Sequence, residues 1–334
     1  MKKIALAAAV ASALTVGTAN AYNLNQEATG LVVPNVIHNG PTNTTAVGIV
    51  SRNAGTVYWV FFDEDSNHVV DGQFAVTAND LHPFVWANAS GIGMEGKRGY
   101  LVFTLDTNSD GAIADTNAIG YMSGNAFQVN TTAKDVEFVP TIPLVMNAAM
   151  NAGTASAATA DYVLPVNLPA MTGASIRSAR LTGVDAGDRL DLRYFIDNAA
   201  GGNDTTIAFW NADELSTSSS TPLTFTAQMY NDAQQRQSIN FALPKRNMNA
   251  VDVETILGRP AAFLDGFIEL TLPAATADTA PGLRVAGGTA CIQHFDSNSG
   301  GATATADCLG GVLAYSRVSS TAFGAVQTLM AAHN

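Results

Sequence analysis

The sequence predicts an all-β protein with two tandem β-sandwich domains, Ig-like or jelly-roll-like, which arose by internal duplication and follow a cleaved signal peptide. Short runs rich in Val, Ile, Phe, Tyr and Thr alternate with clusters of Gly, Asn, Asp, Ser and Pro, as in all-β proteins. Apolar segments recur in the same order roughly 160 residues apart, as expected of a repeated unit. The N-terminus has the composition of an export signal.

The first residues have the three parts of a secretory signal peptide. Met1–Lys3 is basic, Ile4–Val16 is a run of apolar and small residues, and Ala19–Ala21 is a small-x-small cleavage site. The apolar run is shorter than the ~20 residues of a membrane-spanning helix. We therefore expect cleavage after Ala21, no membrane span, and export to the extracellular space or cell surface, with the periplasm as the alternative compartment.

The internal duplication is clearest where two stretches align without a gap, Asp71–Leu105 with Ser238–Leu272. The match lies in the order and spacing of apolar segments rather than in identity. Aromatic, glycine and leucine positions coincide: Phe74 with Phe241, Gly91 with Gly258, Gly99 with Gly266 and Leu105 with Leu272.

Composition divides the chain into segments. Residues 1–21 form the signal peptide, 22–145 the N-terminal sandwich and 161–334 the C-terminal sandwich. The segment between them, 146–160, consists mainly of Ala, Thr and Asn, without aromatic or charged residues, and is predicted to be a linker.

Enrichment in β-branched and aromatic residues marks the strands. Two segments, Leu81–Ala89 and Val251–Leu257, are instead predicted to form short helices, the second ended by Gly258. The predicted strands are Leu31–Ile37, Thr45–Val50, Val57–Phe62, His68–Val76, Tyr100–Leu105, Ala126–Asn130, Val136–Val139, Tyr162–Val166, Ser175–Leu181, Leu190–Ile196, Thr205–Trp210, Leu223–Tyr230, Ser238–Leu243, Phe267–Leu272, Thr289–Gln293 and Gly311–Arg317.

One strand is apolar on both faces, whereas its counterpart in the second copy is not. In Val57–Phe62 the outward residues Tyr58, Val60 and Phe62 are as apolar as the inward ones, while Leu223–Tyr230 alternates between apolar and polar. A strand that is apolar on both faces is covered on both. The outer face of the first sheet is therefore predicted to pack against the rest of the chain or to form an intermolecular interface.

A loop of oxygen-bearing residues follows the strand that ends at Leu105. Asp106, Asn108 and Asp110 occupy positions 1, 3 and 5, with Gly at position 6, and this spacing resembles the calcium loop of EF-hand and dockerin proteins. The resemblance implies a weak structural calcium ion that is also held by the carbonyl of Ala112. Position 12 is Asn rather than Glu, so Asp115 is the candidate replacement. The alternative is a β-turn without an ion.

The two cysteines, Cys291 and Cys308, flank a loop rich in Gly, Ser, Ala and Thr. In an oxidising compartment a disulfide between them would stabilise the fold by up to ~3 kcal/mol. Their spacing is not that of a C-x-x-C redox or metal motif. We therefore expect a structural disulfide.

Charge and motif content narrow the function. The net charge of −12 becomes −14 without residues 1–21, which carry two lysines and no acids; this argues against nucleic acid and anionic membranes as partners. The sequence has no nucleophile elbow, zinc-protease motif, phosphate loop or dinucleotide fingerprint. The chain is therefore predicted not to be an enzyme, although a carboxylate pair for glycoside hydrolysis stays open. The acidic run Asp63–Asn67 is predicted to be a solvated turn.

The function that fits these features is that of an exported non-enzymatic surface or extracellular structural protein. It would self-associate into a filament or matrix or bind other surface proteins, and one version has Tyr22–Ile37 add a strand to a neighbour's sheet. The alternative is a polysaccharide-binding module, with aromatic rings as stacking platforms. The candidate rings are Tyr58, Trp59, Trp86 and Trp210.

Overall fold

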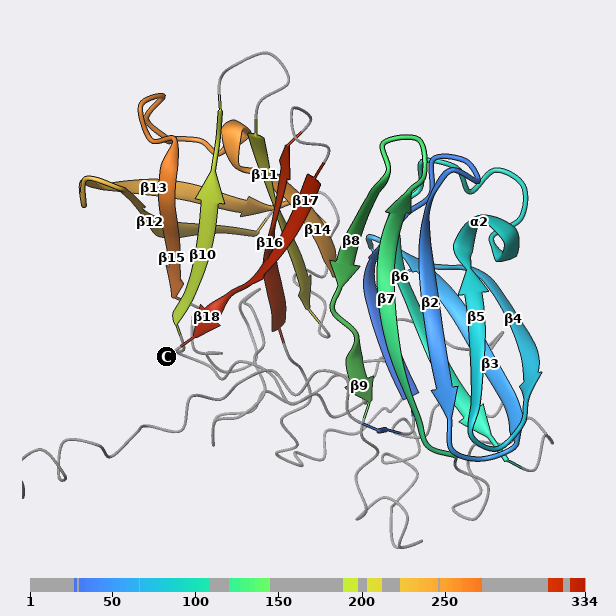
Figure 1. Cartoon of the computed structure of the whole chain (residues 1–334). Coiled ribbons are helices and arrows are strands. Elements are labelled where there is room, and N and C mark those ends of the chain that lie inside the picture. The colour runs from blue at the N-terminus through green and yellow to red at the C-terminus, as the bar shows by residue number, and fades with distance from the viewer. Residues whose placement is uncertain are drawn as a thin grey trace, which may run out of the picture.

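The computed structural model describes residues 27–28, 30–65, 67–107, 120–144, 189–197, 203–211, 223–245, 247–271, 312–320 and 325–333 (Figure 1). This part of the chain is all-β, as predicted, and forms four antiparallel sheets. Its helical pieces are the single turn α2 (Trp86–Ala89) and the 3-10 turn η4 (Val253–Thr255). Within the same residues no helix is long and apolar enough to cross a membrane.

The first half contains two sheets that face each other. The strands, in the order in which they are bonded, are β4 (His68–Val76), β3 (Gly55–Asp63), β6 (Gly99–Asp106), β1 (Gly30–Val36) and β9 (Ile142–Leu144) in one sheet, and β5 (Asp80–Val85), β2 (Asn43–Ser51), β7 (Met122–Asn130) and β8 (Asp135–Val139) in the other.

The second half repeats this strand order, with each strand nine places later in the chain. Its sheets are β13 (Arg236–Leu243), β12 (Leu223–Asn231), β15 (Asp265–Thr271), β10 (Arg189–Phe195) and β18 (Ala332–His333), and β14 (Met248–Asp252), β11 (Asn203–Asn211), β16 (Val312–Ser320) and β17 (Ala325–Met330).

The glycines matched in the sequence occupy equivalent close contacts between strands. Gly99 begins β6 beside β3, and Gly266 lies near the start of β15 beside β12. A Cβ on Gly99 would come within 2.0 Å of the Phe62 carbonyl oxygen, and one on Gly266 within 1.8 Å of that of Tyr230. Both approaches are possible only without a side chain, so the same local packing requires glycine in both halves.

A threonine holds the same junction together in each half. The Thr45 hydroxyl accepts a hydrogen bond from the Ile37 amide (3.1 Å) and donates to its carbonyl (3.0 Å). Thr205 does the same with Phe195, at 2.9 and 2.7 Å. Both threonines are fully buried. Each hydroxyl therefore bonds both backbone groups of one residue at the end of the preceding strand.

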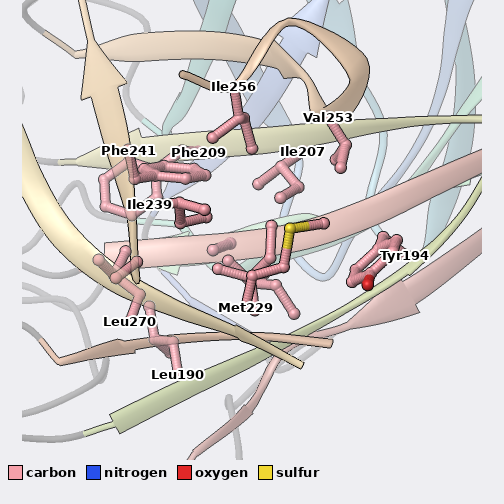
Figure 2. Packing of buried hydrophobic residues seen from close by; sticks show 14 of the residues in the cluster. Leu190, Tyr194, Ile207, Phe209, Met229, Ile239, Phe241, Val253, Ile256 and Leu270 are labelled. Atoms are coloured by element: carbon pink, nitrogen blue, oxygen red, sulfur yellow. The ribbon is translucent and has the colours of Figure 1, made fainter. Parts of the chain in front are cut away.

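Each half has its own apolar core between its two sheets. In the first, Trp86 stacks on Phe61 at 4.6 Å and meets Trp59 edge-on at 6.0 Å. In the second, Phe209 and Phe241 lie among aliphatic residues from both sheets (Figure 2). Alternation along the strands directs these side chains inward, which is the period-2 pattern that the sequence carries.

Both helix predictions are largely wrong. Residues Asp80–Val85 form strand β5, and only Trp86–Ala89 is helical. β5 is an edge strand, where Pro83 leaves no ladder hydrogen bond unmade. Likewise β14 extends to Asp252, and a single 3-10 turn follows. Sheet pairing overrides the weak helical periodicity at both sites.

Besides β5 and β14, three strands of the structure have no counterpart among the predicted strands, and three predicted strands fall outside the described residues. The short strands β9, β17 and β18 were not predicted, because each lies at or near a sheet edge with few β-branched residues. Three predicted strands lie outside the described residues: Tyr162–Val166, Ser175–Leu181 and Thr289–Gln293.

We predict that Thr205→Val destabilises the fold by about 1–3 kcal/mol, because an isosteric side chain leaves the Phe195 amide and carbonyl without their partner. Urea unfolding followed by tryptophan fluorescence measures the change. The matched control Thr224→Val, at an exposed position of β12, should stay within about 0.5 kcal/mol of the wild type. Equal effects of the two substitutions would contradict the assigned role of Thr205.

Candidate functional site

The most extensive feature outside the two cores is the contact between the halves. The outer face of the β4-β3-β6-β1-β9 sheet packs against the outer face of the β14-β11-β16-β17 sheet. The cluster lacks charged side chains and is buried throughout. Its buried members are Val32, Val60, Phe62, Tyr100, Val102 and Ile142 from the first half, and Ala208, Trp210, Met248, Leu313 and Tyr315 from the second.

This contact covers the strand that is apolar on both faces. Val60 and Phe62 are fully buried in it, and Tyr58 packs against it partly buried. Of the two predicted arrangements, cover by the rest of the chain and an intermolecular interface, the structure has the first. Each large apolar side chain buried here contributes about 1.5–3 kcal/mol, so this cluster outweighs the exposed ion pairs around it.

An aromatic stack lies at the centre of the contact. Phe62 and Tyr100, neighbours on β3 and β6, stack with centroids 5.3 Å apart and planes at 19°. Trp210 of the second half meets Tyr100 edge-on at 5.8 Å. The edge-to-face geometry places the positive rim of one ring against the negative face of the other.

The side chain of Asn35, in the first half, reaches a residue of the second half. It has a φ of 54° at an irregularity of β1 and is buried. Its amide Nδ2 donates to the Tyr315 hydroxyl at 3.3 Å, and its Oδ1 accepts from Arg98. Asparagine tolerates this left-handed conformation better than most residues, and here its side chain joins the two halves.

Burial shifts the pKa values of this polar group. Desolvation lowers the pKa of the Arg98 guanidinium, although the Glu64 carboxylate, 3.9 Å away, opposes the shift. Burial also raises the pKa of the Tyr315 hydroxyl above its ordinary value, with a further contribution from Glu137. Tyr315 is therefore neutral at physiological pH and acts through its hydroxyl dipole.

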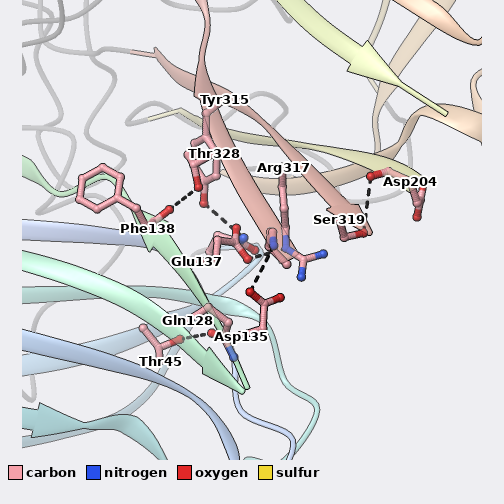
Figure 3. Close-up of polar contacts among 12 residues, drawn as sticks. Thr45, Gln128, Asp135, Glu137, Phe138, Asp204, Tyr315, Arg317, Ser319 and Thr328 are labelled. Carbon is pink, nitrogen blue, oxygen red and sulfur yellow. Dashed lines mark hydrogen bonds and ion pairs between the residues drawn. The ribbon is translucent and has the colours of Figure 1, made fainter. Parts of the chain in front are cut away.

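A second polar link across the contact joins Glu137 of the first half to Arg317 of the second (Figure 3). Glu137 is only 3% exposed, and burial raises its pKa in spite of the opposing charge of Arg317. Arg317 keeps about a third of its side chain in solvent. A buried carboxylate of this kind depends on its one cation, because the low-dielectric surroundings make an unpaired charge costly.

The edge strands β8 and β17 run beside each other at the same place (Figure 1). The Thr328 hydroxyl donates to the Phe138 carbonyl, and the Val326 amide donates to the Asp135 carboxylate at 3.2 Å. Each strand thereby covers the exposed edge of the other, which would otherwise offer unpaired backbone groups to another chain.

The acidic run forms a turn, as predicted, but it also binds the second half. Asp63 accepts hydrogen bonds from the amides of Asp65 and Asn67, at 3.0 and 2.9 Å. Lys245 lies 3.3 Å from the Glu64 carboxylate and 3.6 Å from that of Asp65. Burial alone would lower the Lys245 pKa, and the two carboxylates outweigh it, so the pKa is raised. The turn is therefore an ionic contact between the halves.

The predicted calcium and cysteine residues lie mostly outside the described part of the chain. This holds for Asn108, Asp110, Ala112, Asp115, Cys291 and Cys308. Asp106, the first residue of the loop, is fully buried at the end of β6. Among the described residues no cluster of three or more His, Cys, Asp or Glu side chains is arranged to hold a metal ion.

The four rings considered for glycan stacking are not free surfaces. Trp59 and Trp86 lie in the first core, and Trp210 is buried in the contact between the halves. Tyr58 is partly buried beside that contact. None of these rings presents the open face that stacking on a sugar requires.

The polar residues of the contact were missed by sequence reasoning. Glu137 lies two residues before Val139 on β8 and so shares its inward face, which is a weak signal of a buried charge. Nothing in the sequence pairs it with Arg317, which is 180 residues away. Asn35, Arg98 and Lys245 carry no local pattern that marks them, because their roles depend on how the halves pack.

No family model and no curated protein matches this chain. Among solved structures, Streptomyces avermitilis alpha-L-rhamnosidase complexed with L-rhamnose aligns at a TM-score of 0.20 and 10% identity, covering 94% of this chain and 26% of that one. A TM-score this low carries no argument about activity or ligand.

We predict that Arg317→Met destabilises the protein by about 2–4 kcal/mol at neutral pH, because it leaves Glu137 buried and unpaired. Glu137 already has a raised pKa in the folded state, so the fold binds the extra proton and stability falls as pH rises above 4.5. That fall should be larger in the variant and extend to higher pH, because Arg317 no longer opposes the rise of the Glu137 pKa. Denaturant midpoints measured from pH about 4 to about 8 test this.

The double variant Arg317→Met/Glu137→Gln should recover most of the loss, since no charge is then buried. The control Arg52→Met removes an exposed pair with Glu27 and should cost at most about 1 kcal/mol. If the double variant were as unstable as the single one, the ion pair would not be the cause.

Proposed function

We propose that this protein is an exported, non-enzymatic surface or extracellular structural protein. Its two β-sandwich domains, which arose by duplication, act as one unit. The observation that carries the proposal is the apolar contact between the halves, which joins two sheets over their outer faces. Halves that share a packed apolar face move together, as the parts of a structural component must.

The repeated strand order supports the duplication. All nine strands of the first half have a counterpart at the same place in the second, and the paired glycines and threonines make equivalent contacts. Two unrelated domains would have no reason to share an order of this length together with its local contacts. The domain limits 22–145 and 161–334 and the linker 146–160 belong to this proposal.

The charged groups of the contact support a structural role for it. Glu137 is bonded to Arg317, and Glu64 is shared between Arg98 and Lys245. Each carboxylate thus has a cation from the other half beside it, Arg317 for Glu137 and Lys245 for Glu64. A catalytic acid or base needs a substrate within hydrogen-bond reach, whereas these groups contact other parts of the protein.

Export is supported by the N-terminal signal sequence and by the two cysteines, Cys291 and Cys308. The proposed disulfide Cys291–Cys308 would be oxidised only in a compartment outside the cytosol. The neutral-polar composition, with 13% charged residues, also fits exported β proteins.

Immunogold electron microscopy of intact cells of the source organism, with fractionation, tests the function. We expect the label on the outer surface, on filaments or on a layer, and the N-terminus of the recovered protein at Tyr22. Label confined to the cytosol, or turnover of a glycan by the purified protein, would overturn the proposal. Retention on an insoluble glycan would instead favour the polysaccharide-binding alternative.

We propose a structural calcium ion in the loop that begins at Asp106. Calcium at about ten times its dissociation constant should then stabilise the mature chain by about 1.4 kcal/mol, measured as a rise in the thermal midpoint. Asp110→Asn should abolish the rise, because it removes a ligand charge. The control Glu254→Gln, an exposed acid of the second half, should keep it. A midpoint insensitive to calcium in the wild type would rule the site out.

A further inference from the structure

The contact between the halves uses one outer face of each half, and within the described part of the chain no other strand packs over the remaining two. Because the strand orders correspond, the β5-β2-β7-β8 sheet is the counterpart of the β14-β11-β16-β17 sheet, and the β13-β12-β15-β10-β18 sheet is the counterpart of the β4-β3-β6-β1-β9 sheet. The two remaining faces are therefore the counterparts of the two faces already in contact. We call them the apolar face (on β5-β2-β7-β8) and the aromatic face (on β13-β12-β15-β10).

Strand pairing gives the correspondence residue by residue. Thr45 and Thr205 make equivalent hydrogen bonds and therefore occupy corresponding positions. Val50 and Trp210, each five residues further along the chain, correspond to each other as well. Val50 pairs with Leu81 just as Trp210 pairs with Met248. Trp210 and Met248 are buried in the contact. Their counterparts lie on the apolar face.

The apolar face presents aliphatic and aromatic side chains without a charged group. Leu81 is 65% exposed and Val136 56%, and Phe127 meets Phe138 edge-on at 6.0 Å. A sheet face with exposed apolar side chains and no charged group, interrupted only by Ser123 and Asn125 of β7, has the composition of a contact surface. Its apolar outward-facing residues are Ala46, Val50, Leu81, Pro83, Val85, Phe127, Val129, Val136 and Phe138.

The aromatic face repeats the stacked pair at the centre of the intrachain contact. Tyr230 and Phe267 stack at 4.7 Å with planes at 11°, at the positions of Phe62 and Tyr100. The first-half pair is covered by Trp210, whereas Phe267 remains 37% exposed. The aromatic face thus has the centre of a contact surface without the cover found on its counterpart.

The charges on β15 and β10 of the aromatic face are paired with one another, whereas Arg236, exposed on the edge strand β13 opposite Tyr230, has no carboxylate partner among the described residues. Arg189 lies 3.3 Å from the Asp191 carboxylate and 3.4 Å from that of Glu269, and Arg193 pairs with Asp265. An uncharged surface can therefore cover β15 and β10 without leaving a charge unpaired, while Arg236 keeps its charge in solvent at the edge of the face. An aromatic centre with a polar surround is also the composition of reversible protein interfaces.

We propose that a second copy of this chain docks its apolar face on the aromatic face of the first, repeating between molecules the contact that joins the two halves within one. Because the two faces differ, the contact is heterologous, and each docked copy presents a new free face of each kind. Repetition gives a linear filament with two domains per subunit. This proposal rests on the proposed structural function and supplies its mode of assembly.

It replaces the strand-donation version. Residues Gly30–Val36 are buried in β1, which pairs with β6 on one side and, over Gly30–Val32, with β9 on the other; residues 22–26 lie outside the described residues. That segment is part of its own sheet and is not available to a neighbour, so assembly through faces rather than through a donated strand fits the structure.

Sedimentation velocity on the mature chain over a concentration series tests the docking. The wild type should form species whose size grows with concentration. Leu81→Lys on the apolar face and Phe267→Lys on the aromatic face should each weaken association by about tenfold or more. Ile92→Lys, at a fully exposed turn outside both faces, should not. Circular dichroism establishes that each variant is folded, and Val136→Lys replaces Leu81→Lys if needed.

Mixing the two variants identifies the geometry. Leu81→Lys keeps an intact aromatic face and Phe267→Lys keeps an intact apolar face, so a one-to-one mixture should form a dimer that grows no further. A wild type that stays monomeric would overturn the proposal, and so would a Phe267→Lys protein that associates normally, because the apolar face would then bind itself or another surface. Neither result affects the surface labelling, so failure of docking and failure of the proposed function are told apart.

Discussion

The burial of one apolar sheet face by another, between the two halves of the chain, is the contact on which the rest of the arrangement depends. Without it, Val60, Phe62 and Tyr100 would lie on an open sheet surface. The polar links add direction to this contact. Asn35, Glu137 and Lys245 each find their partner only when the halves meet in one register. Apolar area thus supplies the free energy, and the few hydrogen bonds and ion pairs select one orientation.

The two halves share a strand order but carry different side chains at corresponding positions of their outer faces. Val32 and Val102, directly paired in the first half, correspond to Asp191 and Glu269 in the second. One pair is buried in the contact and the other takes part in ion pairs with Arg189. A duplicated unit needs only a few such replacements to turn an apolar face into one that carries paired charges, because the backbone positions stay the same.

Much of the fold could be predicted from the sequence, and the limits have physical causes. Alternation located most of the strands, and the run Val57–Phe62, apolar on both faces, predicted that its outer face is covered. The short strands β9, β17 and β18 could not be predicted, because packing rather than the β-propensity of their residues makes them strands. The polar residues of the contact escaped for a related reason: Glu137 and Arg317 are far apart in the chain, and no local pattern encodes a partner. Aromatic residues taken as stacking platforms, such as Trp86, belong to the core.

The order of synthesis gives the contact between the halves a further consequence. Strand β3 is completed early, but strands β16 and β17, which cover its side of the molecule, come from residues after 311. During synthesis part of this apolar surface therefore stays exposed until nearly the whole chain is available, and exposed surface of this kind is prone to aggregation. A chain that stops before β16 lacks that part of the cover, so truncated molecules expose apolar surface that complete molecules bury.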